Sequence, residues 1–157
     1  PETRKNLITS IYLDAPAQEA HNLRLQAKYV AMQADARHEA YLCDDAEIVL
    51  VAYGICSRIA RTAAEALRAE GVKAGVFRPL TLNPFPAEAL SATLLGRRAM
   101  VVELSAGQFY NDVILALATA GGRCQEVGLC NRMGGMVMTV DDVVEAARAT
   151  MRKQVIA

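Results

Sequence analysis

The chain has 157 residues, of which 53% are hydrophobic, and its 17 Lys and Arg residues balance its 17 Asp and Glu residues. This length suits one domain of ordinary size with a substantial core. A net charge of zero gives no electrostatic attraction to nucleic acid or to an anionic membrane, and the absence of Trp argues against a base-stacking surface. No apolar run approaches the roughly 20 residues of a membrane helix, and no secretion signal is recognisable.

The chain begins at Pro1 rather than Met, so we expect a piece of a longer protein. Residues 1–13 are interpreted as an extended lead-in from a missing upstream domain. Residues 14–157 form the domain itself. Apolar residues at helical spacing predict that its first segment is a helix, capped by Asp14 and continuing to about Asp35.

Strand and helix patterns alternate in the rest of the chain. Residues 38–43 either continue the first helix or form a short strand. Apolar runs typical of strands covered on both faces occur at residues 47–53, 72–78, 99–104 and 124–129. Helical patterns occupy residues 58–70, 86–95, 108–119 and 140–154. Ser57 and Thr139 are expected to cap the first and last of these helices. This alternation predicts right-handed βαβ crossovers and a mainly parallel sheet between two helical layers.

In a parallel sheet every strand ends at the same edge, where ligands usually bind. Four loops should therefore meet there, at residues 54–58, 78–86, 105–108 and 131–135. Together with the strand ends, these loops supply the candidate ligand or interface residues: Gly54, Ser57, Arg58, Arg78, Asn83, Glu103, Gly107, Gln108, Arg132, Gly134 and Gly135.

The first two loops each have a structural and a functional interpretation. Residues 54–58 form either a plain capped turn or a helix start whose amides and arginine attract a phosphate or carboxylate. They lack the spacing of a dinucleotide site and of a P-loop. Three prolines stiffen residues 78–86, which form either a structural crossover anchored by a buried Phe85 or a surface that presents Arg78 and Asn83.

The other two loops also leave alternatives open. We expect Glu103 to form an ion pair with Arg78 from a neighbouring strand; the alternative is a hydrogen bond to a ligand or a subunit. Residues 131–135 form a turn whose glycines permit positive φ or close backbone approach. Three nearby methionines either face an interface or fill the core: Met133, Met136 and Met138.

No catalytic set is present in the sequence. The cysteines contain no CxxC motif and are interpreted as small core residues of a cytoplasmic protein: Cys43, Cys56, Cys124 and Cys130. The two histidines, His21 and His38, lie far in sequence from the predicted loop edge and are interpreted as packed or solvated. We therefore assign no catalytic residue and no metal ligand.

Several motifs carry a family resemblance. Residues 52–86, AYGICSRIARTAAEALRAEGVKAGVFRPLTLNPFP, resemble the C-terminal region of the alpha chain of 2-oxoacid:ferredoxin oxidoreductases, and the branched-chain 2-oxoisovalerate type is most similar. The resemblance continues through VVELSAGQF and NRMGG and includes the segment upstream, so it covers nearly the whole chain. A frequent Asn of the family is Ser105 in this sequence.

This resemblance implies a fold like the C-terminal domain of transketolase. That fold is a three-layer α/β/α sandwich whose five-stranded, mostly parallel sheet has an antiparallel first strand, which favours a strand at residues 38–43. The family oxidatively decarboxylates a 2-oxoacid to acyl-CoA and reduces ferredoxin. Thiamine diphosphate, Mg and iron–sulfur clusters are expected elsewhere in the complex, with none bound by this chain.

The implied role is assembly with the other subunits or domains of the oxidoreductase, with ferredoxin and CoA as partners of the full complex and no activity in the isolated chain. Two alternatives remain. The first is an independent module that binds a small anion, such as a nucleotide or CoA, through residues 54–58 and Arg78. The second is the matching domain of another thiamine enzyme, such as transketolase.

Overall fold

The computed structural model describes residues 13–152, and the chain divides into two units between Asp35 and Ala36. In the first unit, α1 (Ala15–Met32) leads into a short 3-10 helix, η1 (Gln33–Asp35). The Asp14 carboxylate accepts a hydrogen bond from the backbone N–H of Ala17 at 3.0 Å, which confirms the predicted cap. The predicted lead-in lies outside the described residues, except for its last residue.

The second unit is a sandwich of helices around one sheet. The strands are β1 (His38–Tyr41), β2 (Ile48–Ala52), β3 (Ala74–Pro79), β4 (Arg98–Glu103) and β5 (Glu126–Asn131), and they lie in the order β1-β3-β2-β4-β5. Strands β2 to β5 run parallel, and β1 pairs antiparallel with β3. This confirms the predicted fold, including the strand at the start of the unit.

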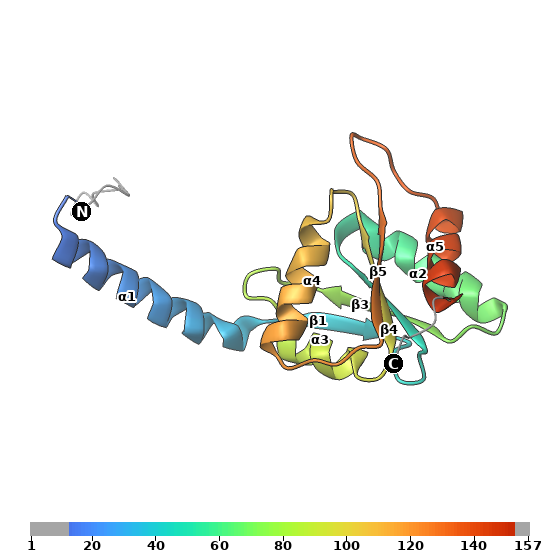
Figure 1. Ribbon diagram of the computed structural model, residues 1–157, viewed down its shortest axis with the longest axis horizontal. Helices are drawn as coiled ribbons and strands as arrows, with labels where there is room; N and C mark the ends of the chain where they lie inside the picture. The colour runs from blue at the N-terminus through green and yellow to red at the C-terminus, as the bar shows by residue number, and fades with distance from the viewer. Residues whose placement is uncertain (1–12, 153–157) are drawn as a thin grey trace, which may run out of the picture. The chain divides into compact units, whose positions relative to one another are not determined.

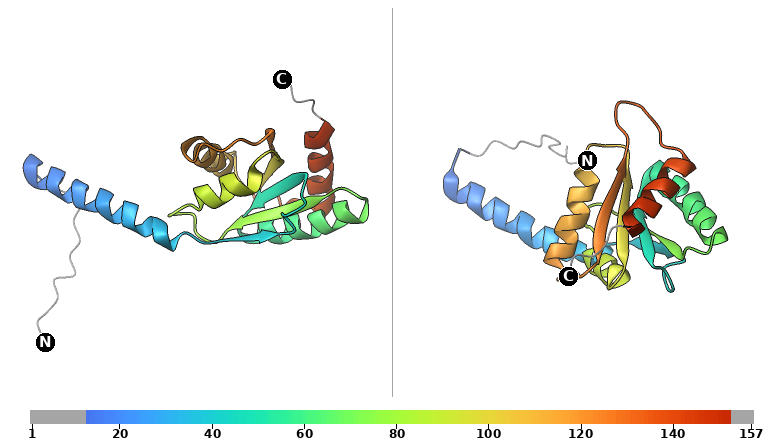
Figure 2. Two further views of the ribbon diagram at one scale, coloured as in Figure 1. Left: turned by 90° about the horizontal axis from the view of Figure 1, so that it is seen from below. Right: turned by 45° about the vertical axis from the view of Figure 1, so that its right-hand side comes forward.

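Helices cover both faces of this sheet. They are α2 (Gly54–Ala69), α3 (Ala87–Leu94), α4 (Gln108–Thr119) and α5 (Val140–Arg152). Helices α2 and α5 pack on one face, and α3 and α4 pack on the other (Figures 1 and 2). Among the described residues, none of the helices is both long enough and apolar enough to span a bilayer.

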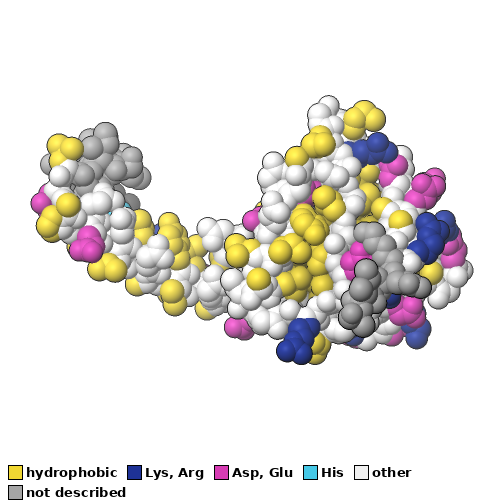
Figure 3. All heavy atoms as spheres, in the orientation of Figure 1, with side chains coloured by type: hydrophobic (Ala, Val, Ile, Leu, Met, Phe, Trp, Pro, Cys, Tyr) yellow, Lys and Arg dark blue, Asp and Glu magenta, His cyan; other side chains and the backbone are white. Residues whose placement is uncertain are grey.

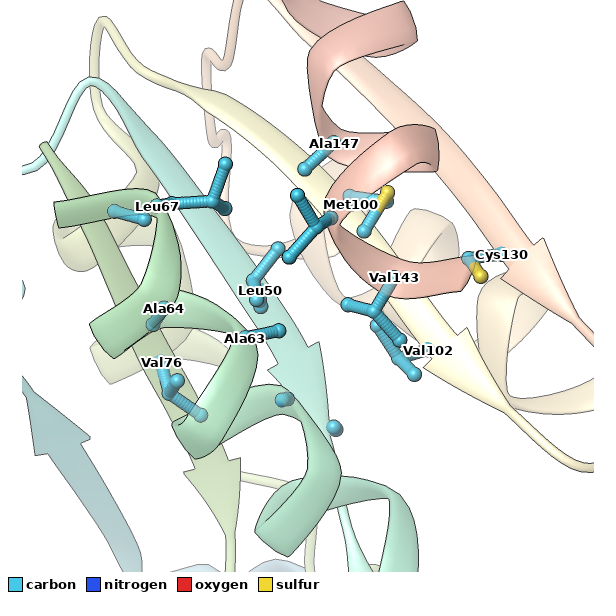
Figure 4. Close-up of a cluster of buried hydrophobic side chains, with 14 of the residues drawn as sticks. Leu50, Ala63, Ala64, Leu67, Val76, Met100, Val102, Cys130, Val143 and Ala147 are labelled. Carbon is cyan, nitrogen blue, oxygen red and sulfur yellow. The ribbon is translucent and has the colours of Figure 1, made fainter. Parts of the chain in front are cut away.

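Burial on both faces explains why the sequence of the central strand, β2, is continuously apolar. All five residues of β2 are buried, and successive side chains point to opposite faces of the sheet. Leu50 packs with α2 and α5 beside Leu67, Met100 and Val143 (Figure 4), whereas Val51 packs in the cluster on the α3 and α4 side. A strand with a core on each side has no position for a polar residue.

The two helix caps predicted in the second unit, Ser57 and Thr139, have different outcomes. The prediction for Ser57 is wrong, because α2 already begins at Gly54, where a φ of +57° takes the backbone directly out of β2. Ser57 lies in the first turn and donates a hydrogen bond to the Gly54 carbonyl at 2.7 Å. The prediction for Thr139 is confirmed: its Oγ1 accepts from the Asp142 N–H at 3.1 Å, and Asp142 accepts from the Thr139 N–H at 2.8 Å.

Candidate functional site

The carboxyl ends of β2, β3, β4 and β5 meet at one edge of the sheet, as the parallel alternation predicts. The antiparallel strand β1 adds its first residues to the same edge. His38 lies opposite Pro79, and Glu39 lies opposite Arg78. The loop edge therefore includes side chains that precede the first parallel strand in the sequence.

The predicted ion pair between Arg78 and Glu103 is wrong. β2 lies between β3 and β4, so the two residues are separated by a whole strand. The Arg78 guanidinium instead lies 3.2 Å from the carboxylate of Glu39, its partner across the β1–β3 pair. Strands consecutive in sequence are not neighbours at this point of the sheet, and the prediction assumed that they were.

Glu103 has a different function in the structure. Its side chain is 1% exposed. Oε1 accepts hydrogen bonds from the Ser105 hydroxyl at 3.0 Å and from the Gly107 N–H, and Oε2 accepts from the Tyr110 N–H at 2.9 Å. Gly107 is the N-cap of α4 and has a φ of +97°. The carboxylate thus satisfies amides at the start of α4, where a negative charge is favourable.

A small pocket lies near this edge, on the face of the sheet that α2 covers. Its volume is about 60 Å³. β1, β3 and the first half of α2 supply the lining residues: Glu39, Tyr41, Ser57, Arg58, Arg61, Val76 and Arg78. The structure thereby brings together three of the predicted site residues, Ser57, Arg58 and Arg78.

The pocket has an excess of positive charge, with three guanidinium groups against the single carboxylate of Glu39. The Arg61 guanidinium carbon lies 3.8 Å from the centroid of the Tyr41 ring, which is within cation–π distance. The Tyr41 hydroxyl donates to Glu65 at 2.9 Å, which turns that carboxylate toward the tyrosine. This arrangement suits a negatively charged ligand.

The guanidinium groups of Arg58 and Arg61 differ from those that hold the fold together. Arg68 donates to the carbonyls of Ala74 and Leu42 and to Asp45, and Arg97 donates to three backbone carbonyls. Within the described part of the chain, the guanidinium groups of Arg58 and Arg61 donate no hydrogen bond. Their donors are available to a ligand.

The remaining predicted residues lie away from the pocket. Asn83 is exposed in the proline-rich loop, and Gln108 is exposed at the first position of α4. Arg132 forms an ion pair with Asp142 at 2.7 Å. Gly134 and Gly135 have φ values of +65° and +84°, so the turn after β5 uses the conformational freedom predicted for it.

Four lining residues of the pocket were missed by the sequence analysis: Glu39, Tyr41, Arg61 and the apolar Val76. Arg61 follows Arg58 by three residues, a spacing that places both side chains on one face of a helix, and this signal was present in the sequence. Glu39 and Tyr41 reach the pocket only because β1 pairs with β3. No local pattern specifies that pairing.

The four cysteines are buried or half-buried, whereas His38 is exposed. Burial raises the pKa of all four thiols, Cys43, Cys56, Cys124 and Cys130. Within residues 13–152, no group of three or more His, Cys, Asp or Glu could hold a metal ion. His38 stacks on Phe77 with a centroid distance of 5.1 Å, and in space it lies at the loop edge.

A hydrophobic surface lies over α4 and β5, at the edge of the sheet away from the pocket. β5 is an edge strand, and Leu129 on it is 40% exposed, while Leu115 on α4 is 63% exposed. Figure 3 shows hydrophobic side chains gathered over α4 and β5. In the loop after β5, Met138 is buried and fills the core, whereas Met133 and Met136 are exposed.

Comparisons with known proteins agree with this architecture. Residues 46–143 match the model of the pyruvate:ferredoxin oxidoreductase core domain II. The chain is 47% identical over 149 residues to the ketoisovalerate oxidoreductase subunit VorB of Methanothermobacter thermautotrophicus, covering 94% of this chain and 41% of that protein. It is 36% identical over 102 residues to the 2-oxoglutarate synthase subunit KorA of Methanothermobacter marburgensis, covering 64% of this chain and 26% of that protein.

Two solved structures share the fold. The 2-oxoglutarate:ferredoxin oxidoreductase of Magnetococcus marinus superposes with a TM-score of 0.67 and 21% identity, covering 88% of this chain and 24% of that one. A split gene transketolase superposes with a TM-score of 0.59 and 23% identity, covering 73% of this chain and 41% of that one. The chain thus spans about two fifths of the length of VorB and smaller fractions of the other oxidoreductase chains.

Proposed function

Because the chain belongs to the pyruvate:ferredoxin oxidoreductase core domain II family, we propose that it is an assembly domain of a 2-oxoacid:ferredoxin oxidoreductase subunit. The observation that carries this proposal is the 47% identity to VorB over 94% of the chain. The likeness extends through both units rather than a single motif. It favours 2-oxoisovalerate as the 2-oxoacid of the complete enzyme.

The chemistry of the complete enzyme belongs to parts outside this domain. We place thiamine diphosphate, Mg and the iron–sulfur clusters on other domains or subunits, and we name ferredoxin and CoA as partners of the whole complex. Among residues 13–152, no group of three or more His, Cys, Asp or Glu could hold a metal ion. The free cysteines support a cytoplasmic location, where thiols remain reduced.

The surface over α4 and β5 supports an assembly role. An edge strand with unpaired backbone groups and exposed apolar side chains is a favourable site for contact with another chain. Leu115 and Leu129 lie on this surface and are exposed in the domain. We propose that other parts of the oxidoreductase cover them.

A chimeric complex tests this function. The chain replaces the matching segment of VorB in the Methanothermobacter thermautotrophicus oxidoreductase, and 2-oxoisovalerate- and CoA-dependent reduction of ferredoxin is measured. We expect the chimera to assemble and turn over, and the isolated chain to be inactive. The isolated chain should also show no change in melting temperature with thiamine diphosphate and Mg²⁺. A chimera that does not assemble, or a clear shift with the cofactor alone, contradicts the proposal.

The same chimera locates the contact surface. Leu115→Asp with Leu129→Asp should abolish co-purification with the other subunits, because burying a carboxylate in an apolar contact is unfavourable. Leu95→Asp is the matched control, since Leu95 is 64% exposed and lies outside the α4 and β5 surface. Equal loss of assembly in both variants would show that the loss is not specific to the α4 and β5 surface, and would contradict its role in assembly.

A further inference from the structure

The pocket between β1, β3 and α2 is not explained by an assembly role. Its three arginines come from two elements: Arg58 and Arg61 extend from α2, and Arg78 extends from the end of β3. A purely structural arginine is expected to donate to carbonyls or carboxylates, as Arg68 and Arg97 do. Two of the pocket arginines have no such acceptor in the described structure.

We propose that this pocket binds one phosphate group through Arg58, Arg61 and Arg78. Guanidinium groups present planar, paired donors that match the oxygens of a phosphate. The pocket contains two more guanidinium groups than carboxylates, which matches the double negative charge of a phosphate near neutral pH. The site is independent of the proposed assembly role and rests on this geometry alone.

The size of the pocket favours a single head group. A volume of about 60 Å³ is several times the roughly 10–15 Å³ that a cavity needs to hold one water molecule. Pockets for whole drug-sized ligands are about 300–1,000 Å³. A phosphate head group therefore fits inside, and any larger ligand would extend into solvent. An acidic peptide would need a longer groove to hold successive side chains.

The neighbouring charges permit Arg78 to join the site. Its pair with Glu39 is 3.2 Å long, and the two side chains are 42% and 54% exposed. Such an exposed pair contributes little, so the Arg78 guanidinium can turn from Glu39 toward a dianion. The Arg61 guanidinium lies over the Tyr41 ring, and its N–H groups donate no hydrogen bond in the described structure. Glu39 is the one lining group that repels the ligand.

The test is a two-dimensional NMR titration of the chain with inorganic phosphate, at constant ionic strength maintained with sodium chloride. The backbone amides of residues 39–41, 57–61 and 76–78 should shift together and saturate. A parallel titration with AMP distinguishes free from esterified phosphate: similar affinities mean that only the head group is bound, and tighter AMP binding identifies a phosphate ester. A hexaglutamate peptide that binds where phosphate and AMP do not would overturn the proposal.

Charge variants decide whether the pocket is responsible. Arg58→Gln with Arg61→Gln should weaken phosphate binding about tenfold or more. The control Arg123→Gln with Arg152→Gln removes the same charge from exposed positions outside the pocket and should leave the affinity within about twofold. Glu39→Gln should strengthen binding about two- to fivefold, because it removes the repelling carboxylate. Equal weakening by both double variants, or no response to either, refutes the site.

Discussion

The buried carboxylate of Glu103 provides a quantitative test of how the loop edge is held. Glu103→Gln keeps the shape but replaces one carboxylate oxygen by an NH₂ group. If the remaining oxygen faces Ser105 and Gly107, the Tyr110 N–H meets a donor and loses its acceptor. An unsatisfied buried donor costs about 1–3 kcal/mol. Loss of the charge at the start of α4 costs a further 0.3–1 kcal/mol or so, and the remaining hydrogen bonds weaken.

We therefore expect Glu103→Gln to lower the free energy of unfolding by about 1.5–4 kcal/mol, a large share of the roughly 5–15 kcal/mol of a typical domain. Urea denaturation followed by circular dichroism measures this loss. With an m-value of about 2 kcal/mol/M, the midpoint should fall by roughly 0.7–2 M.

Two further variants make this result specific. Ser105→Ala removes only one donor to Glu103 and should cost about 1 kcal/mol. Arg78→Gln should cost less than about 1 kcal/mol, because its partner Glu39 is solvent-exposed. A loss below 1 kcal/mol for Glu103→Gln, or an equal loss for Arg78→Gln, would refute the role assigned to the carboxylate.

Three other predictions concern packing, pH and thiol reactivity. Gly75→Ala should destabilise the chain by about 1–3 kcal/mol, because a Cβ there would lie 2.7 Å from the Leu42 carbonyl oxygen; an unchanged urea midpoint would contradict this. The Thr139 N–H and Arg132 hold the pKa of Asp142 below its usual value, so Asp142→Asn should lower stability at neutral pH. That difference should shrink below about pH 4, as the carboxylate of the parent protein becomes protonated, and a pH-independent difference would argue against the cap. Burial raises the pKa of the thiols of Cys43, Cys56, Cys124 and Cys130. An aromatic disulfide reagent at pH 8 should therefore label these thiols slowly until urea is added. Rapid labelling of the native protein would show instead that the thiols are accessible.

The architecture was largely predictable because its strands carry a strong local signal. A strand buried on both faces, such as residues 48–52, cannot include polar side chains and is therefore visible in the sequence. The edge strand β1 has only four residues, and none of them is fully buried. Its identity needed the family resemblance, because so short and exposed a segment has no clear periodicity. The start of α2 was predicted too late, because the turn was assigned to Gly54 and the cap to Ser57, whereas the helix begins at Gly54 itself.

The candidate site was harder to predict because it depends on which strands are neighbours. Arg78 and Glu103 end consecutive strands in the sequence, yet β2 separates those strands in the sheet. Long-range pairing is set by the packing of the whole core, and no local pattern records it. Arg58 was predicted, and Arg61 could have been, because the spacing of these two residues follows from the helix alone. Glu39 and Tyr41 were not, because they precede the first parallel strand and return beside β3 only through antiparallel pairing.

The contrast between two helix starts explains where a ligand is expected at this edge. The start of α4 already holds a carboxylate from its own chain, because Glu103 accepts from Gly107 and Tyr110. An added anion there would meet occupied amides and a buried negative charge. The first half of α2 has no internal carboxylate of this kind and instead presents Arg58 and Arg61 to the pocket. The chain thus neutralises one helix start from within and leaves positive charge beside the other, so an external anion is directed to α2.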